Sequence, residues 1–195
     1  DPAIREYALG VFKSEFPFHS NGEVSSIKRV AEGVEITFKS EPDSQEQTKV
    51  FEYLLAATGR RANVDNLNIE NTQLTLDTRG IPVYDPLSMQ CGHSHIFIAG
   101  DVNGDIPLLH EASDEGRLAG ENAGRFPEVF KRARKTPLGV VFSDPQIATV
   151  GKSYSQLVAS KVPFASSSVS FENQGRARVM LVNKGLMRLY GEKET

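Results

Sequence analysis

Two apolar segments of the chain end in a glycine followed by a polar residue, a pattern that can build a ligand site. Residues 54–58 run into Gly59–Arg60, and residues 96–99 run into Gly100–Asp101. In open parallel sheets, ligands bind just beyond the carboxyl ends of the strands, and glycine there lets a ligand approach the backbone. The Asp101 carboxylate could accept hydrogen bonds from sugar-like hydroxyl groups, or it could simply cap a turn.

A helix predicted from about Ile106 to Gly124 begins shortly after Asp101. Asp105 is placed to cap this helix, and Pro107 suits its first turn. The free N–H groups at its start, together with the positive end of the helix dipole, could face an electron-rich ligand atom. Because every helix has such a start, the feature supports a ligand site only in combination with Asp101.

Cys91 is the single cysteine of the chain. One cysteine excludes an internal disulfide framework and indicates a reducing compartment, so we expect the protein to be cytoplasmic. A lone thiol could be a nucleophile, but an inert or half-buried loop cysteine is favoured. The sequence also contains no Gly-x-Gly-x-x-Gly turn, and we predict no metal ligands.

Charge and hydropathy exclude several classes of partner. The net charge of −3 over 195 residues gives no reason to expect binding to nucleic acid or to an anionic membrane. No apolar run is long enough to span a bilayer. The chain begins at Asp1 without a methionine, and we therefore expect it to begin inside a longer polypeptide.

The first third of the chain predicts a helix followed by strands. Residues 1–16 place apolar side chains at helical spacing behind an Asp-Pro start. Residues 24–30 and 34–39 predict a hairpin, and residues 49–53 a third strand of the same meander. Residues 54–58 are apolar without alternation, which predicts a strand buried on both faces.

The rest of the chain predicts short strands around the second helix. Residues 60–80 are polar and suit a crossing segment between domains. Residues 81–84 predict an edge strand, residues 96–99 a second buried strand, and residues 127–137 a linker. Later elements are strands at 140–142, 147–150, 164–171 and 186–190, with a short helix opened by a capping box at 153–156.

The order of these landmarks is more specific than any one of them. They are Ala57–Asn63, Ile96–Val102, Pro107–Ala112, Gly116–Gly120 and Val141–Gly151. The series resembles the pyridine nucleotide-disulfide oxidoreductase family, most closely its dihydrolipoamide dehydrogenase members. One departure is Ala62, where the family usually has proline, which implies a less rigid loop.

The resemblance implies an α/β fold, mixed α+β at the C-terminal part, with partial Rossmann-like FAD/NAD(P)-binding domains and a partial α+β dimerisation domain. Residues 1–64 would be the latter part of the NAD(P)-binding domain with its β-meander. Residues 65–125 would be the return segment of the FAD-binding domain, residues 126–136 a linker, and residues 137–195 the N-terminal part of the dimerisation domain.

The resemblance also implies roles for individual residues. Asp101 would hydrogen-bond the ribityl chain of FAD, and the backbone N–H groups at the helix start would face the flavin C2 carbonyl. His110 is as well explained by a packing or capping role as by a functional one. The predicted residues beside the nicotinamide cofactor are Gly59 and Arg60, and those at the flavin are Gly100, Asp101, Leu108, Leu109 and His110.

The implied function is electron transfer between a dithiol–disulfide substrate and NAD or NADP through FAD, in a homodimer acting on a lipoyl-carrying or small disulfide substrate. Dihydrolipoamide dehydrogenase is the favoured member, and soluble pyridine nucleotide transhydrogenase, glutathione reductase and mercuric reductase are alternatives. The redox cysteine pair and the acid-base His–Glu pair of the family lie outside these 195 residues. We therefore predict no catalytic residue here, no FAD bound to the isolated chain and no activity. An alternative of another class is a non-catalytic binding or dimerisation module.

Overall fold

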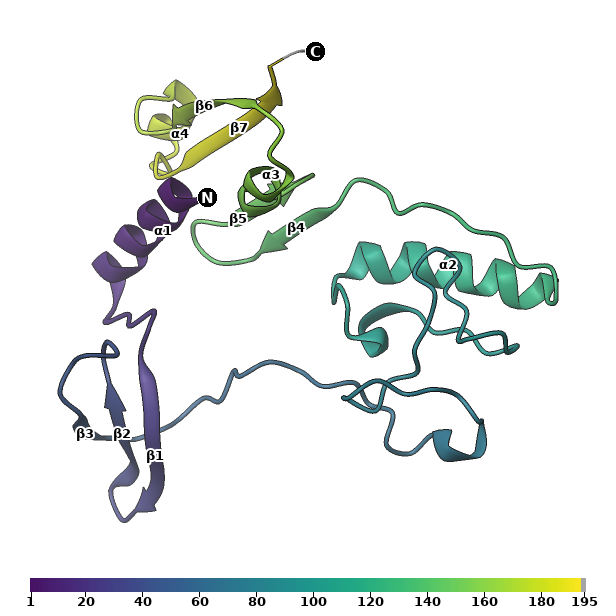
Figure 1. Ribbon diagram of the computed structural model, residues 1–195. Helices are drawn as coiled ribbons and strands as arrows, with labels where there is room; N and C mark the ends of the chain where they lie inside the picture. Colours follow the sequence, from purple (N-terminus) through teal and green to yellow (C-terminus); the bar gives the residue numbers. More distant parts are fainter. Residues whose placement is uncertain (194–195) are drawn as a thin grey trace. The chain divides into compact units, whose positions relative to one another are not determined.

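The computed structural model describes residues 1–193 and divides into two compact units. The first unit contains Asp1–Ala57 together with the residues from Val140 onward. The second unit is Thr58–Gly139. Figure 1 shows the elements of both units.

The first unit begins with helix α1, Pro2–Glu15. The Asp1 carboxylate accepts hydrogen bonds from the N–H groups of Ala3 at 2.7 Å and Ile4 at 3.1 Å, so the predicted N-cap is confirmed. The hydroxyl of Tyr7 accepts a hydrogen bond from the Gly185 N–H at 2.7 Å. Helix α1 is thereby attached to the loop that precedes the last strand.

The predicted meander is present as an antiparallel sheet of β1 (Glu23–Val30), β2 (Gly33–Lys39) and β3 (Gln47–Phe51). The tight turn between β1 and β2 depends on Gly33, whose φ is +143°. A Cβ at this position would lie 2.2 Å from the carbonyl oxygen of Phe51. Any other residue would therefore push β3 away from β2.

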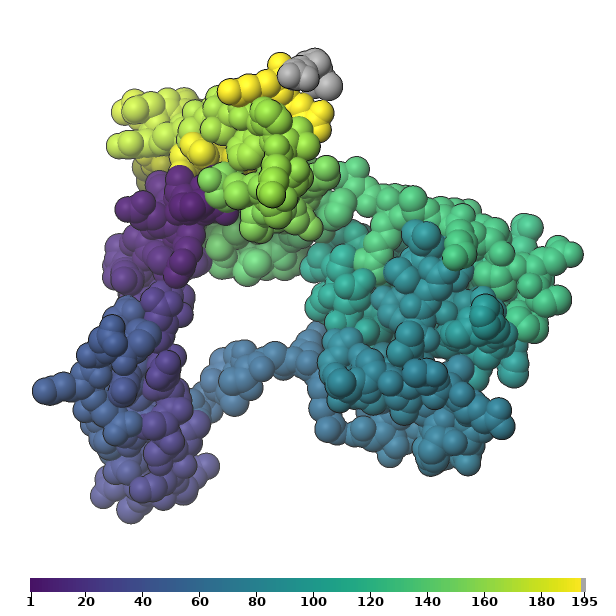
Figure 2. Space-filling view, viewed as in Figure 1, coloured from purple at the N-terminus to yellow at the C-terminus, as the bar shows by residue number. Residues whose placement is uncertain are grey.

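The prediction of a buried strand at Leu54–Thr58 is wrong. These residues form no helix or strand, and the side chain of Leu55 is 87% exposed. Figure 2 shows this stretch as a narrow, extended strip of atoms. A strand buried on both faces needs paired neighbours for its N–H and C=O groups, and none of the described residues provides such a neighbour.

The C-terminal part of the first unit consists of short elements, most of them as predicted. The capping box is confirmed, because Ser153 accepts from the Gln156 N–H and the Gln156 side chain accepts from the Ser153 N–H. The short helix Gly175–Val179 (α4) was not predicted. The remaining elements are the β4–β5 sheet (Leu138–Val141 and Ile147–Val150), α3 (Tyr154–Ser160) and the antiparallel pair β6–β7 (Phe164–Ser170 and Leu186–Glu192).

The second unit is built around helix α2, Leu109–Arg125, with short 3-10 helices at Ile69–Asn71 and Gly100–Asn103. The predicted strands at 81–84 and 96–99 are wrong as strands. Only isolated bridges form there: Leu76 with Pro82, Tyr84 with Cys91, and Gln90 with Phe97. The apolar pattern of these segments predicts their burial, but a strand also requires a continuous hydrogen-bonded partner.

Two apolar clusters form the core of the second unit. One is centred on Ile81, Cys91 and Ile98, and the other on Met89, Leu118 and Ala119. Cys91 is fully buried, and burial raises the pKa of its thiol. This environment favours the inert role expected from the sequence. Across residues 1–193, no helix is long and apolar enough to cross a membrane.

Candidate functional site

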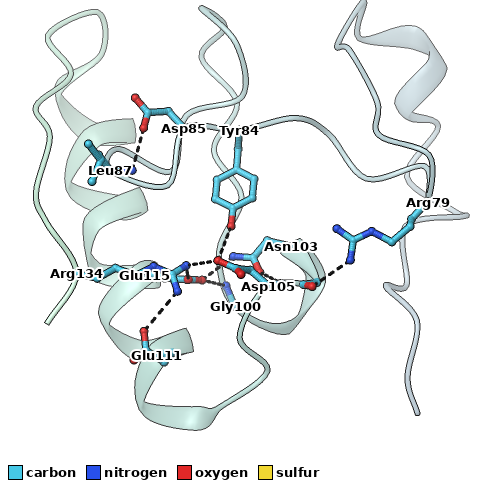
Figure 3. Close-up of polar contacts among 11 residues, drawn as sticks. Arg79, Tyr84, Asp85, Leu87, Gly100, Asn103, Asp105, Glu111, Glu115 and Arg134 are labelled. Carbon is cyan, nitrogen blue, oxygen red and sulfur yellow. Dashed lines mark hydrogen bonds and ion pairs between the residues drawn. The ribbon is translucent and has the colours of Figure 1, made fainter. Parts of the chain in front are cut away.

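The 3-10 helix Gly100–Asn103 lies against α2 in the second unit (Figure 3). Gly100 has a φ of +79°, and a Cβ at this position would lie 3.1 Å from the Cβ of Ala112. Glycine therefore permits both the backbone conformation and the close approach of this turn to the helix. Asp101, the next residue, is held beside the N-terminal half of α2.

Glu115 fastens this turn from the helix side. Its side chain is only 4% exposed. The carboxylate oxygen Oε2 accepts hydrogen bonds from the backbone N–H of Gly100 at 2.8 Å and from the side-chain amide of Asn103 at 2.7 Å. Glu115 and Asn103 were not predicted from the sequence, although both lie at the centre of the arrangement.

Arg134 brings a positive charge to the same place (Figure 3). Its guanidinium group pairs with Glu115, lies 2.9 Å from Asp105, and lies 3.9 Å from Glu111. The Tyr84 hydroxyl donates to the Asp105 carboxylate across 3.5 Å. Burial, and then the negative charges of Asp105 and Glu115, raise the pKa of Tyr84 to about 12, so its hydroxyl stays protonated as a donor.

Two of the predicted cofactor-binding residues come together here. The guanidinium of Arg60 lies 3.7 Å from the Asp101 carboxylate, with side-chain exposures of 84% and 49%. An ion pair this exposed contributes little to stability, and the half-exposed carboxylate of Asp101 can accept hydrogen bonds from a ligand. Gly59 has a φ of +101° and open space where a Cβ would stand.

Helix α2 begins at Leu109, later than the start predicted at about Ile106. Its N-cap is Leu108, whose side chain makes no capping hydrogen bond. The prediction that Asp105 caps the helix is therefore wrong, and Asp105 pairs with Arg134 instead. The first-turn N–H groups, including those of Leu109 and His110, have no partner within the helix.

His110 points to a backbone carbonyl. Its ring Nε2 lies 2.8 Å from the Leu138 carbonyl oxygen, to which it donates. This contact corresponds to the packing role that the sequence left open for His110. Leu109 is almost fully exposed. No group of three or more His, Cys, Asp or Glu side chains among residues 1–193 could hold a metal ion.

Residues 128–135, called the strap below, run along α2 without helix or strand structure. Asn122, fully buried on α2, donates to the Ser88 carbonyl at 2.9 Å and to the Phe130 carbonyl at 3.0 Å. Its side-chain oxygen accepts from the Phe130 N–H at 3.1 Å. The strap is further held by the ion pairs Lys131–Asp85, Arg132–Glu121, Arg134–Glu115 and Lys135–Asp114.

The attachment of the strap through Asp85 is expected to weaken in acid. Lys131 at 2.7 Å, and then the Leu87 N–H at 2.9 Å, lower the pKa of the Asp85 carboxyl below its ordinary value. A carboxyl whose pKa is lower in the folded state stabilises that state above the unfolded pKa, and the contribution is lost as pH falls through the folded pKa.

We therefore expect Asp85→Asn to cost about 0.5–1 kcal/mol at pH 6 and to cost progressively less below about pH 4. Thermal unfolding of the chain and of the variant, followed by circular dichroism over this pH range, measures the difference. Lys131→Met removes the same ion pair through its other partner. Its loss of stability relative to the parent chain should also shrink as the pH falls. A loss of stability in Asp85→Asn that stays constant down to about pH 2 would contradict a role for the Asp85–Lys131 ion pair.

Comparison with known proteins identifies the class to which this fold belongs. The chain superposes on HOCl-induced flavoprotein disulfide reductase RclA of Escherichia coli, in its Cu(II) complex, with a TM-score of 0.80 and 21% identity over 100% of this chain and 43% of that one. LpdA of Mycobacterium tuberculosis gives a TM-score of 0.75 and 24% identity over 97% of this chain and 41% of that one. The fold is thus that of part of a flavoprotein disulfide reductase.

The sequence matches give the family. Residues 1–116 match the sequence family of pyridine nucleotide-disulphide oxidoreductases, and residues 138–195 match the family of their dimerisation domain. The chain belongs to the pyridine nucleotide-disulphide oxidoreductase family, whose members depend on FAD and NAD(P).

Individual relatives do not single out one member of the family. Soluble pyridine nucleotide transhydrogenase of Sodalis glossinidius is 31% identical over 175 residues, which is 90% of this chain and 36% of that protein. Dihydrolipoyl dehydrogenase of Bacillus subtilis is 33% identical over 194 residues, which is 93% of this chain and 38% of that protein. The chain therefore spans little more than a third of the length of these relatives.

Proposed function

We propose that this chain forms part of the flavin site and the start of the dimerisation domain in a longer flavoprotein. That flavoprotein transfers electrons between a dithiol–disulfide pair and NAD(P) through FAD. The observation that carries the proposal is the Gly100–Asp101 turn, held by Glu115 beside the start of α2 in a chain of this family. The domain boundaries proposed from the sequence, after residues 64, 125 and 136, apply to that longer protein.

The chemistry of the turn fits one part of FAD. Asp101 presents a half-exposed carboxylate, which can accept hydrogen bonds from the ribityl hydroxyl groups. The first-turn N–H groups of Leu109 and His110 are donors at the positive end of the α2 dipole and suit the flavin C2 carbonyl, whereas the Leu108 N–H already donates to the Ile106 carbonyl at 2.8 Å. When bound, FAD supplies the two-electron redox chemistry, and these residues bind the flavin and favour negative charge on it.

The nicotinamide side of the proposal rests on Gly59 and Arg60. Gly59 leaves open space at its Cα, and Arg60 is almost fully exposed, so both are accessible to a cofactor. Arginine also pairs readily with phosphate groups because its guanidinium donates in a fork.

Named relatives support two of the family members proposed from the sequence as candidates for the longer protein. Dihydrolipoamide dehydrogenase is the favoured one, with a lipoyl-carrying or small disulfide substrate. Soluble pyridine nucleotide transhydrogenase is the alternative, supported by several relatives of that name at about the same identity. Assaying the longer protein with dihydrolipoamide plus NAD, and with NADPH plus a second nicotinamide nucleotide, separates the two.

The same proposal includes a homodimer in the cytoplasm. The match of residues 138–195 to the dimerisation domain supports the homodimer. Relatives named as soluble proteins and the single, buried, non-disulfide Cys91 support a reducing cytoplasmic setting. The net charge of −3 favours neither a nucleic acid nor an anionic membrane as partner.

Asp101→Ala in the longer flavoprotein is expected to weaken FAD binding by roughly 10- to 150-fold, because the loss of a hydrogen bond to a charged acceptor costs about 1.5–3 kcal/mol. Flavin fluorescence during equilibrium dialysis measures the dissociation constant. Asp114→Ala, at an exposed aspartate of α2 paired with Lys135, serves as the control and should bind FAD normally. Unchanged flavin affinity in Asp101→Ala would remove Asp101 from the site.

A further inference from the structure

Glu115 is a buried carboxylate whose partners are all polar groups of the turn and the strap. Its side chain is 4% exposed, and a charge in such a position is costly unless it is paired and hydrogen-bonded. Two N–H donors, from Gly100 and Asn103, meet one of its oxygens, and Arg134 meets the other. Both oxygens of the carboxylate are therefore engaged by groups of this chain.

The two donors lie on either side of Asp101 in the sequence. Gly100 precedes it and Asn103 follows two residues later, and both are tied to the same oxygen of Glu115 (Figure 3). Because residues on both sides of Asp101 are held by Glu115, the backbone of Asp101 is held as well. The direction of the Asp101 side chain is thereby fixed. The Asp101 side chain itself stays half exposed.

Arg134 orients Glu115 from the opposite side. It is the only cation that pairs with Glu115 among the described residues, and it also reaches Asp105 and Glu111. A buried ion pair is seldom more stabilising than apolar residues of the same volume. Its value here lies in geometry, since the planar guanidinium fork holds a carboxylate in one orientation.

We propose that Glu115 is a positioning residue for flavin binding, which holds the Gly100–Asn103 turn so that Asp101 faces the cofactor, and that Arg134 of the strap keeps Glu115 in place. This inference rests on the proposed flavin site. The affinity for FAD then also depends on the buried contact between Glu115 and Arg134 of the strap, away from the cofactor. A binding group that is misplaced by an ångström loses much of its effect.

The test is Glu115→Gln in the longer flavoprotein. Glutamine keeps the size of the side chain but replaces one acceptor oxygen by an NH₂ donor, so either the turn or Arg134 loses its acceptor. We expect the dissociation constant for FAD to rise at least about tenfold and the visible absorption spectrum of the bound flavin to change. Glu121→Gln removes the partner of Arg132 on the same helix and strap and should change the dissociation constant by less than about twofold.

A double-substitution cycle with Asp101→Ala tells whether Glu115 acts through Asp101. If it does, adding Glu115→Gln to Asp101→Ala weakens FAD binding little further, whereas fully additive losses would overturn the inference. Normal FAD affinity in Glu115→Gln combined with a loss in Asp101→Ala would also overturn it and leave the proposed function standing. Normal affinity in both variants would overturn the proposed flavin site itself.

Circular dichroism of each variant separates misfolding from mispositioning. Should Glu115→Gln fail to fold, Arg134→Lys takes its place, because lysine keeps the positive charge and removes the guanidinium fork. A folded Arg134→Lys variant with weakened FAD binding and an altered flavin spectrum supports the inference. Unchanged FAD affinity in that variant overturns it.

Discussion

The 195-residue chain by itself is expected to show no reduction of lipoamide or glutathione disulfide by NADH or NADPH above the rate in buffer. Exchange of two electrons with a disulfide needs two thiols that can form and break a bond with each other, and the chain has one cysteine. That cysteine, Cys91, is fully buried, and burial raises the pKa of its thiol and so keeps the reactive thiolate scarce. The sequence also has no Gly-x-Gly-x-x-Gly turn to bind a pyrophosphate.

The measurement is the loss of nicotinamide absorbance with each disulfide, with and without added FAD, next to the longer flavoprotein as positive control. The Cys91→Ser variant of the 195-residue chain should give the same background rate as the parent chain. Turnover that disappears in Cys91→Ser would contradict the prediction and give this thiol a catalytic role. Stoichiometric flavin absorbance in the purified chain would show that the phosphate-binding turn is dispensable for FAD.

Local signals in the sequence predicted the local structure well. The cap at Asp1 and the capping box at Ser153 depend on side chains within four residues of one another, so their spacing alone is sufficient. The meander follows from alternating apolar residues and a turn at Gly33. Such elements form wherever their own residues permit.

Strands that depend on distant partners were predicted less well. Residues 54–58 and residues 96–99 carry the same apolar pattern, yet the first is exposed and the second is partly buried without a continuous ladder. Composition reports the preference of a segment for burial, whereas pairing depends on what lies beside it. No property of residues 54–58 themselves could have given this difference.

Only the solvent-exposed residues of the candidate site were predicted from the sequence. The sequence pattern pointed to Asp101 and Arg60, which the structure places 3.7 Å apart. It did not point to Glu115 or Arg134, although a signal for them exists. Glu111 and Glu115 lie four residues apart on a helix rich in small residues, and buried carboxylates require a cation, which the basic run at 131–135 supplies. That run was interpreted as part of a linker because residues 127–137 are basic and are bounded by two prolines.

Asn122→Ala is expected to release the strap from α2. The Asn122 side chain is fully buried and makes three hydrogen bonds to backbone groups of Ser88 and Phe130. Alanine would leave these backbone groups without partners in a buried place, at a cost on the order of 2–3 kcal/mol. If this free energy is lost mainly from the attachment of the strap to α2, the open form, in which the strap has detached from α2, becomes roughly 30- to 140-fold more populated.

Trypsin provides the readout, because the strap contains Lys131, Arg132, Arg134 and Lys135, which become better substrates when the strap detaches. Cleavage within the strap should accelerate by the same factor as the open population, provided that opening and closing are fast relative to cleavage. Glu121→Ala is the matched control: it removes an exposed partner of Arg132 next to Asn122, and it should accelerate cleavage only about two- to fivefold. Equal acceleration in the two variants would mean that surface charge, and not the buried amide, holds the strap on α2. An unchanged cleavage rate in Asn122→Ala would mean that the ion pairs alone suffice to hold the strap on α2.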